Sequence, residues 1–205
     1  MDYPPLLLAS SSPYRKALLA RLNLSFITAS PDIDESPSRD ETPAELAVRL
    51  ASEKAAALAN THPDHWIIGS DQVASLSTGE TLSKPGTYEK AVQQLTRSSG
   101  QTVTFCTGLC LLDASNNRQQ SHCETFQAHF RTLSQTEIEH YLNIEQPYDC
   151  AGSFKMEGLG IALFESLEGR DPNSLVGLPL IALTDMLKNW GVNPLLQPAL
   201  KTAPD

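Results

Sequence analysis

Two long strand-like runs follow one another in the second half of the sequence. Thr102–Asp113 and Gln119–Arg131 are rich in strand-forming residues, and the letters ASNNR join them. Two such runs separated by turn residues indicate a long β-hairpin. The hairpin adds antiparallel strands to the sheet that the rest of the chain builds.

Before and after this hairpin, short apolar strands alternate with helices whose starts are marked by capping residues. Strands are predicted at Leu6–Ala9, Leu24–Ala29, Trp66–Ser70 (ending on Asp71) and Gly160–Leu167. Helices are predicted at Pro13–Leu22, from Thr42 to about Ala59, at Thr87–Arg97, from Ser134 to about Ile144, and at Leu178–Trp190. Because βαβ units flank a hairpin, the pattern predicts an α/β fold with a mixed sheet.

The composition is that of a globular protein. The chain has 205 residues, of which 40% are hydrophobic and 19% are charged. This length suits a single domain over 1–205, with one or two lobes and a well-buried core. The tail after Pro194 is expected to be loosely held.

Charge and cysteine content exclude several classes of protein. A net charge of -9 disfavours wrapping a nucleic-acid backbone, which rewards a broad basic surface, so no nucleic-acid partner is expected. No run approaches the 18 or so apolar residues of a membrane span, and the N-terminus lacks the basic region of a signal peptide. The four cysteines show no paired CxxC spacing. A reducing cytoplasm is therefore the expected compartment.

The stretch SSSPYRK, residues 10–16, lies where the first strand joins the first helix. Serine hydroxyls and free N–H groups at a helix start bind anions, and Arg15 and Lys16 add positive charge. Plain helix capping by Ser12 explains the same letters. The residues alone leave both interpretations open.

Carboxylates and lysines follow several other strands. Asp71 comes at the end of a predicted buried strand, where it can act as a general base, a metal ligand or a turn cap. Glu35 lies in an acidic loop and offers an oxygen ligand for Mg²⁺, or is simply solvated. Lys54, Lys84 and Lys155 are well separated in sequence. Three such lysines with carboxylates between them suit a metal-bound polyphosphate.

The predicted hairpin contains residues of the types that bind zinc. Cys106 and Cys110 lie four residues apart in one predicted strand, and His122 and Cys123 lie in its partner. The ligand spacing typical of zinc sites is absent, which favours buried cysteines and a surface histidine.

Eight motifs in order are similar to those of the Maf family of nucleotide pyrophosphatases. They are LASSSPYRKALL, DIDESP, RLASEKA, IIGSDQV, LSKP, SGQTVTFCTGL, CAGSFKMEGLG and NSLVGLPL. The resemblance implies an elongated mixed sheet flanked by helices, with two lobes and a central cleft, as in Maf and ITPase-like proteins. It implies hydrolysis of a nucleoside triphosphate between the α and β phosphorus with a divalent cation, Mg²⁺ or Mn²⁺. A homodimer is expected from the resemblance and because most oligomers are symmetric dimers.

The resemblance also assigns roles to residues. Asp71 takes the position of the proton acceptor. The oxygen chemistry of the carboxylates, more than the resemblance, makes Glu35 and Asp71 candidate metal ligands. The resemblance places Ser10, Arg15, Glu35, Lys54 and Lys84 at the phosphate end. Ser12, at the start of the first helix, and Lys155, among glycines, are further candidates for substrate binding.

Three positions depart from the branch of the family that acts on dTTP and UTP. Tyr14, Gln72 and Glu157 stand where that branch has arginine, threonine and glutamine. These residues resemble the branch that acts on 7-methyl-GTP, although that branch often has tryptophan at the Tyr14 position. An aromatic ring stacks on a cationic base, and a carboxylate accepts from the two N–H donors of guanine. The alternatives are a dTTP/UTP pyrophosphatase or a non-enzymatic nucleotide-binding regulator of cell division.

Overall fold

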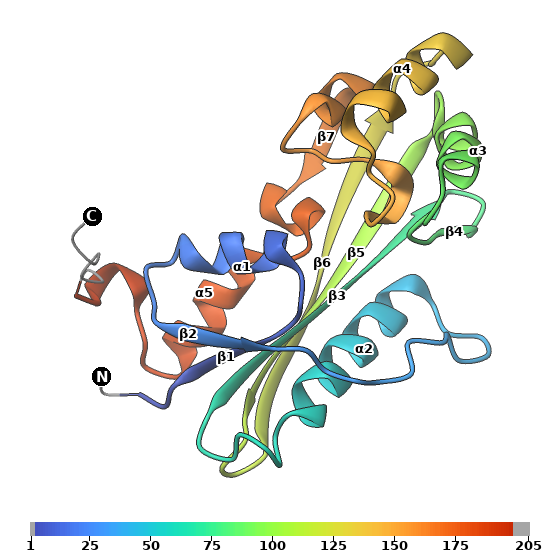
Figure 1. Cartoon of the computed structure of the whole chain (residues 1–205). Helices are drawn as coiled ribbons and strands as arrows, with labels where there is room; N and C mark the ends of the chain where they lie inside the picture. The colour runs from blue at the N-terminus through green and yellow to red at the C-terminus, as the bar shows by residue number, and fades with distance from the viewer. Residues whose placement is uncertain (1–2, 199–205) are drawn as a thin grey trace.

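A seven-stranded mixed sheet organises the protein, whose computed structural model describes residues 3–198 (Figure 1). Six strands lie in the order β2-β1-β3-β5-β6-β7, and β4 pairs with β3. The strands are β1 (Leu6–Ala9), β2 (Phe26–Ala29), β3 (Trp66–Leu76), β4 (Thr81–Leu82), β5 (Thr102–Asp113), β6 (Arg118–Phe130) and β7 (Phe164–Gly169). The pairs β1–β2 and β1–β3 are parallel, and the remaining pairs are antiparallel. The predicted α/β fold with an elongated mixed sheet is confirmed.

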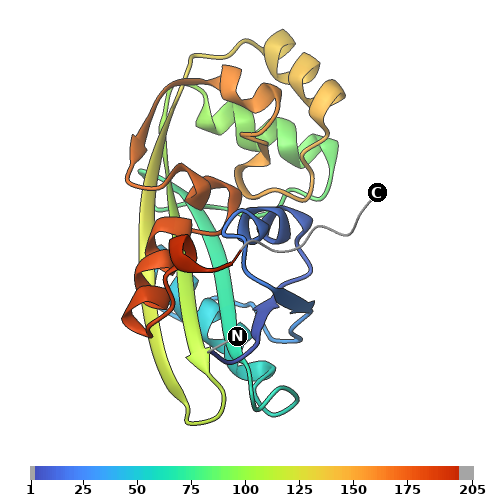
Figure 2. The ribbon, with the colours of Figure 1, turned by 90° about the vertical axis from the view of Figure 1, so that its left-hand side faces the viewer.

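Helices gather at both ends of the long strands, as Figures 1 and 2 show together. They are α1 (Pro13–Ala20), α2 (Pro43–Ala57), α3 (Tyr88–Ser98), α4 (Gln135–Glu145) and α5 (Leu180–Asn189). The capping boxes predicted at Thr42 and Ser134 are present at the starts of α2 and α4. Among the described residues, no helix is both long enough and apolar enough to cross a membrane.

The hydrophobic core divides into parts that define two lobes. One buried cluster joins α3, α4 and the neighbouring ends of β3, β5 and β6; this is the α3–α4 lobe. The other clusters pack α1, α5 and α2 on the two faces of the sheet around β1; this is the α1–α2–α5 lobe. β3 and β5 contribute to both lobes, so they pass from one to the other without a break.

The predicted end of the third strand at Asp71 was wrong. β3 continues to Leu76 because β5 pairs with it residue by residue as far as Leu76↔Val103. Beyond the polar pair Asp71 and Gln72, Ala74 and Leu76 enter the core of the α3–α4 lobe. Asp71 therefore lies in the middle of a strand.

The last elements also differ from their predicted bounds. Residues 159–163 form a 3-10 helix (Leu159–Leu163), and the strand begins only at Phe164. A short 3-10 helix, Pro194–Leu196, occupies the start of the tail that was expected to be loosely held. Residues 199–205 of that tail lie outside the described residues.

Two glycines let α2 approach the sheet closely. A Cβ added at Gly69 of β3 would overlap the carbonyl oxygen of Ala51, and one added at Gly108 of β5 would overlap that of Ala47. Both obstacles are backbone atoms of α2, which cannot rotate away. The helix therefore lies directly on the strands at these two points.

Gly108→Ala should destabilise the protein by about 2–3 kcal/mol, because overpacking forces the backbone of α2 off the sheet. Urea unfolding monitored by circular dichroism measures this loss. Gly79→Ala is the matched control. Gly79 has open space around it and a φ of +86°, so alanine there meets backbone strain alone, about 1 kcal/mol. An equal loss in the two variants would contradict the close packing.

Candidate active site

The candidate site is a cleft at a gap in the sheet. β1 pairs with β3 as far as Gly69, and β4 pairs with β3 only from Ala74. In the described part of the chain, no strand pairs with residues 70–73 on this side of β3. A cleft of about 750 Å³ opens there between the two lobes.

Nearly all the predicted site residues line this cleft. They are Ser10, Ser12, Tyr14, Arg15, Glu35, Lys54, Asp71, Gln72, Lys84 and Glu157. They come from the loop after β1, from α1, from the loop before α2, from α2, from β3 and from two segments of the α3–α4 lobe. Lys155 is not among the lining residues; its ammonium donates to the carbonyl of Glu145 at 3.0 Å.

Lys54 stands between two carboxylates. Its Nζ lies 2.6 Å from Oε1 of Glu35 and 2.6 Å from Oδ1 of Asp71. The side chains of Lys54 and Asp71 are 9% and 12% exposed, whereas that of Glu35 is 57% exposed. The pair on the sheet side is thus largely withdrawn from water, and Glu35 covers it from the solvent side.

These contacts lower the pKa of Glu35. The hydrogen bond from Lys54 is the largest cause; burial opposes it, and the charges of Lys54, Lys84 and Arg15 reinforce it. Glu35 therefore keeps its negative charge to lower pH than a free glutamate does.

The start of α1 supplies the next part of the site. Oγ of Ser12 accepts from the Arg15 backbone N–H at 3.4 Å and caps the helix, and Oγ of Ser10 accepts from the Ser12 N–H at 3.1 Å. The Arg15 side chain donates through Nε to the Gly177 carbonyl at 2.8 Å. Burial lowers the pKa of Arg15, and the charges of Asp71 and Glu35 oppose that shift. Capping and a cationic cleft wall therefore coexist in this segment.

Tyr14 and Glu157 lie at the part of the cleft formed by α1 and the segment after α4. Burial raises the pKa of Tyr14; the neighbouring Cys150 and Asp149 reinforce the shift, and Lys155 opposes it. Glu157 is exposed, and its carboxylate accepts no hydrogen bond from the described residues. An aromatic ring and a free carboxylate thus border the same cleft.

Gln72 holds a different element in place. Its Nε2 donates to the Ser174 carbonyl at 2.6 Å and to Oγ1 of Thr107 at 3.3 Å. Ser174 belongs to the 3-10 helix Pro172–Val176, which closes one side of the cleft. The amide nitrogen of Gln72 is therefore occupied, whereas its carbonyl oxygen accepts nothing from the described residues.

Some cleft residues were not found from the sequence. Asp149 and Cys150 line the cleft beside Tyr14, and Gly177 accepts from Arg15. Gly177 has a φ of +104°, a conformation that favours glycine. The motif NSLVGLPL contains it, but its letters do not show that a carbonyl would meet the arginine of α1.

The donor groups of the cleft suit a hard cation together with a phosphorylated ligand. Among the described residues, no group of three or more His, Cys, Asp and Glu side chains could hold a metal ion, the cysteines of the hairpin included. Glu35 and Asp71 meet at a single ammonium. Mg²⁺ is usually held by one or two carboxylates together with substrate phosphates and water, and Glu35 and Asp71 could supply two.

The fold and the cleft together define an α/β protein with a charged cleft between two lobes. The family described as Maf-like protein matches residues 5–190. The 7-methyl-GTP pyrophosphatase of Alcanivorax borkumensis is 58% identical over 189 residues, which cover 92% of this chain and 95% of that relative. The Ham1 protein of Staphylococcus aureus resembles the fold with a TM-score of 0.54 at 11% identity, over 91% of this chain and 99% of that one. The chain belongs to the Maf family.

Lys54→Met should raise the pKa of Glu35, because it removes the largest cause of the lowered value. A ¹³C NMR titration of the Glu35 side-chain carboxyl, assigned with Glu35→Gln, measures the change. Lys90→Met is the control, since Lys90 is exposed on α3 and lies outside the cleft. An unchanged Glu35 pKa in Lys54→Met would contradict the lysine bridge.

Proposed function

We propose that the protein is a nucleoside triphosphate pyrophosphatase that converts 7-methyl-GTP to 7-methyl-GMP and pyrophosphate and so removes a modified nucleotide. The observation that carries the proposal is the contact of Lys54 with both Glu35 and Asp71 inside the cleft. It puts a buried cation, which can stabilise phosphate charge, beside a buried carboxylate, which can accept a proton from water. Family membership and the relative from Alcanivorax borkumensis support the same reaction.

The triphosphate lies along the cationic wall. Arg15, Lys54 and Lys84 all line the cleft, and each lies close enough to Glu35 to lower its pKa. Positive groups placed at the developing charge of the leaving pyrophosphate stabilise the transition state. The Ser10 hydroxyl, at the start of α1, adds a neutral donor for a phosphate oxygen.

Asp71 acts as the general base. Its Oδ1 is held by Lys54 at 2.6 Å, so the other oxygen is left to orient a water molecule for in-line attack at the α phosphorus. The proton of that water passes to Asp71 as the new P–O bond forms and the bond to pyrophosphate breaks. Neighbouring Lys54 stabilises the carboxylate in the orientation that receives the proton.

A divalent cation, Mg²⁺ or Mn²⁺, would be held by Glu35 and Asp71 together with the phosphates. When bound, it supplies Lewis-acid stabilisation of the phosphate charge.

The residues at the base end of the cleft distinguish nucleotide bases by their charge. Methylation at N7 makes guanine cationic, and a cationic ring gains from the face of Tyr14. Glu157 accepts from N1–H and the exocyclic amine of guanine, and such charge-assisted hydrogen bonds are about twice as strong as neutral ones. Glutamine in place of Glu157 would offer one acceptor and one donor, which suits uracil and thymine.

We also propose a cytoplasmic homodimer. The described cysteines are all free, which suits a reducing compartment, and twofold dimers are the commonest oligomers. Light scattering on the purified protein gives its mass in solution.

Asp71→Asn should lower kcat by about 10²–10⁴-fold, the usual contribution of a general base, and leave nucleotide binding largely intact. Pyrophosphate release from a panel of triphosphates with Mg²⁺ or Mn²⁺ measures turnover, and calorimetry with a non-hydrolysable analogue measures binding. Asp64→Asn, at an exposed position outside the cleft, is the control. Near wild-type turnover in Asp71→Asn would exclude Asp71 as the base. If wild-type protein hydrolysed no triphosphate, the nucleotide-binding regulator would become the leading alternative.

Glu157→Gln combined with Tyr14→Arg should lower kcat/KM for 7-methyl-GTP by about tenfold or more, since a charge-assisted hydrogen bond contributes roughly 1.5–3 kcal/mol. Relative activity towards dTTP and UTP should rise. Competition between these substrates measures the ratio of their kcat/KM values. Glu165→Gln, at an exposed position of β7 away from the cleft, is the control. An unchanged ratio would contradict the assignment of the base end.

A further inference from the structure

Glu35 is carried by a loop without regular secondary structure. The loop spans residues 30–42 between β2 and α2, and the Glu35 side chain is 57% exposed. Among the loop side chains, Ile33 packs against a hydrophobic cluster beside α2. The placement of the Glu35 carboxylate over the cleft therefore depends on how the loop is fastened to α2.

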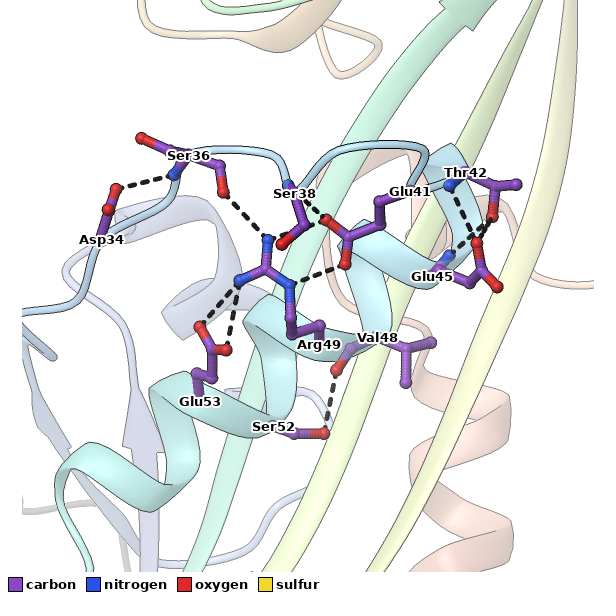
Figure 3. Close-up of polar contacts among 10 residues, drawn as sticks. All are labelled: Asp34, Ser36, Ser38, Glu41, Thr42, Glu45, Val48, Arg49, Ser52 and Glu53. Atoms are coloured by element: carbon purple, nitrogen blue, oxygen red, sulfur yellow. Dashed lines mark hydrogen bonds and ion pairs between the residues drawn. The ribbon is translucent and has the colours of Figure 1, made fainter.

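Arg49 of α2 fastens this loop through its guanidinium, as Figure 3 shows. Nε and Nη2 donate to the two carboxylate oxygens of Glu41 at 2.7 and 2.9 Å. Nη2 also donates to the Ser36 carbonyl at 3.0 Å. Ser36 follows Glu35 directly, and Glu41 precedes the α2 cap, so one side chain holds both ends of residues 36–41.

The loop residues complete the arrangement with their own hydrogen bonds (Figure 3). The Ser36 N–H donates to Oδ1 of Asp34 at 2.9 Å, and the Ser38 N–H donates to Oε2 of Glu41 at 3.0 Å. The oxygen that Ser38 contacts is the one that Nη2 of Arg49 holds. Removing the guanidinium therefore loosens the turn as well as the ion pair.

The contact has the bidentate geometry in which an ion pair near the surface can contribute to stability. The Glu41 side chain is 10% exposed, and the pairing with Arg49 is bidentate. The pKa of Glu41 is lowered to about 2, chiefly by the hydrogen bond from Arg49, so both groups are charged at neutral pH. Lysine could not replace Arg49, because a point charge lacks the fork that meets a carboxylate and a carbonyl together.

We propose that Arg49 is a positioning residue that holds Glu35 over the cleft by anchoring residues 36–41 to α2, and this role in turnover rests on the proposed function. Arg49 and Lys54 belong to the same helix. α2 thus holds Glu35 twice, by its backbone neighbour Ser36 through Arg49 and by its carboxylate through Lys54.

Hydrogen exchange tests the anchor without reference to activity. Arg49→Gln should speed exchange of the Ser36, Ser38 and Glu41 amides by about tenfold or more, since the charge-assisted hydrogen bonds that hold the loop are lost. Amides within α2 should be unchanged. Glu41→Gln removes the contact from the loop side and should act in the same direction. Glu53→Gln is the matched control, because Glu53 contacts Arg49 only within the helix, at 3.1 Å. Unchanged exchange in both Arg49→Gln and Glu41→Gln would overturn the proposal.

A double-mutant cycle tests the route of the effect. Arg49→Gln should lower kcat/KM for 7-methyl-GTP by about tenfold in the wild-type background and have little further effect in Glu35→Gln, because the two residues act through one carboxylate. Equal losses in both backgrounds would overturn the proposal, as would full activity of Glu35→Gln. A wild-type protein that hydrolysed no triphosphate would disprove the proposed function, and hydrogen exchange would then decide the positioning role alone.

Discussion

The contact between the backbone of α2 and the sheet is the constraint on which the cleft depends. At Gly69 and Gly108 no side chain separates the helix from β3 and β5. Lys54 lies one turn beyond Ala51, which rests on Gly69, so the same approach brings its ammonium to Asp71 at 2.6 Å. A larger residue at either glycine would move a whole helix, and the ammonium would move with it.

The gap in the sheet explains how one strand, β3, contributes side chains to two walls of the cleft. Successive side chains of a strand point to opposite faces, so Asp71 faces α2 whereas Gln72 faces the 3-10 helix Pro172–Val176. Both line the cleft because neither β1 nor β4 covers residues 70–73. Asp71 thus meets Lys54 on one face, while Gln72 secures the opposite wall through Ser174.

Short-range sequence patterns predicted many of the helices and strands correctly. The capping boxes at Thr42 and Ser134 depend on residues three apart, and both were predicted correctly. The continuation of β3 past Asp71 was not predicted, because it depends on pairing with β5, whose partner residues lie 27 to 35 positions further along the chain. The resemblance named Lys54 and Asp71, but only the structure gives their contact. The motif RLASEKA does not show whether its arginine, Arg49, binds the preceding loop or is solvated.

The long strands also set how the lobes can move. Each residue of β3 from Trp66 to Leu76 is in register with β5, and β5 is paired in turn with β6 along its whole length. The chain therefore crosses between the lobes in a stiff, cross-linked ribbon, whereas hinges are formed by a few loop or element-terminal residues. The paired strands therefore limit changes in the distance between the two walls of the cleft. The segment anchored by Arg49 and the turn that bears Asp149 lie outside this paired ribbon, and each contributes a residue to the lining of the cleft, Pro37 and Asp149.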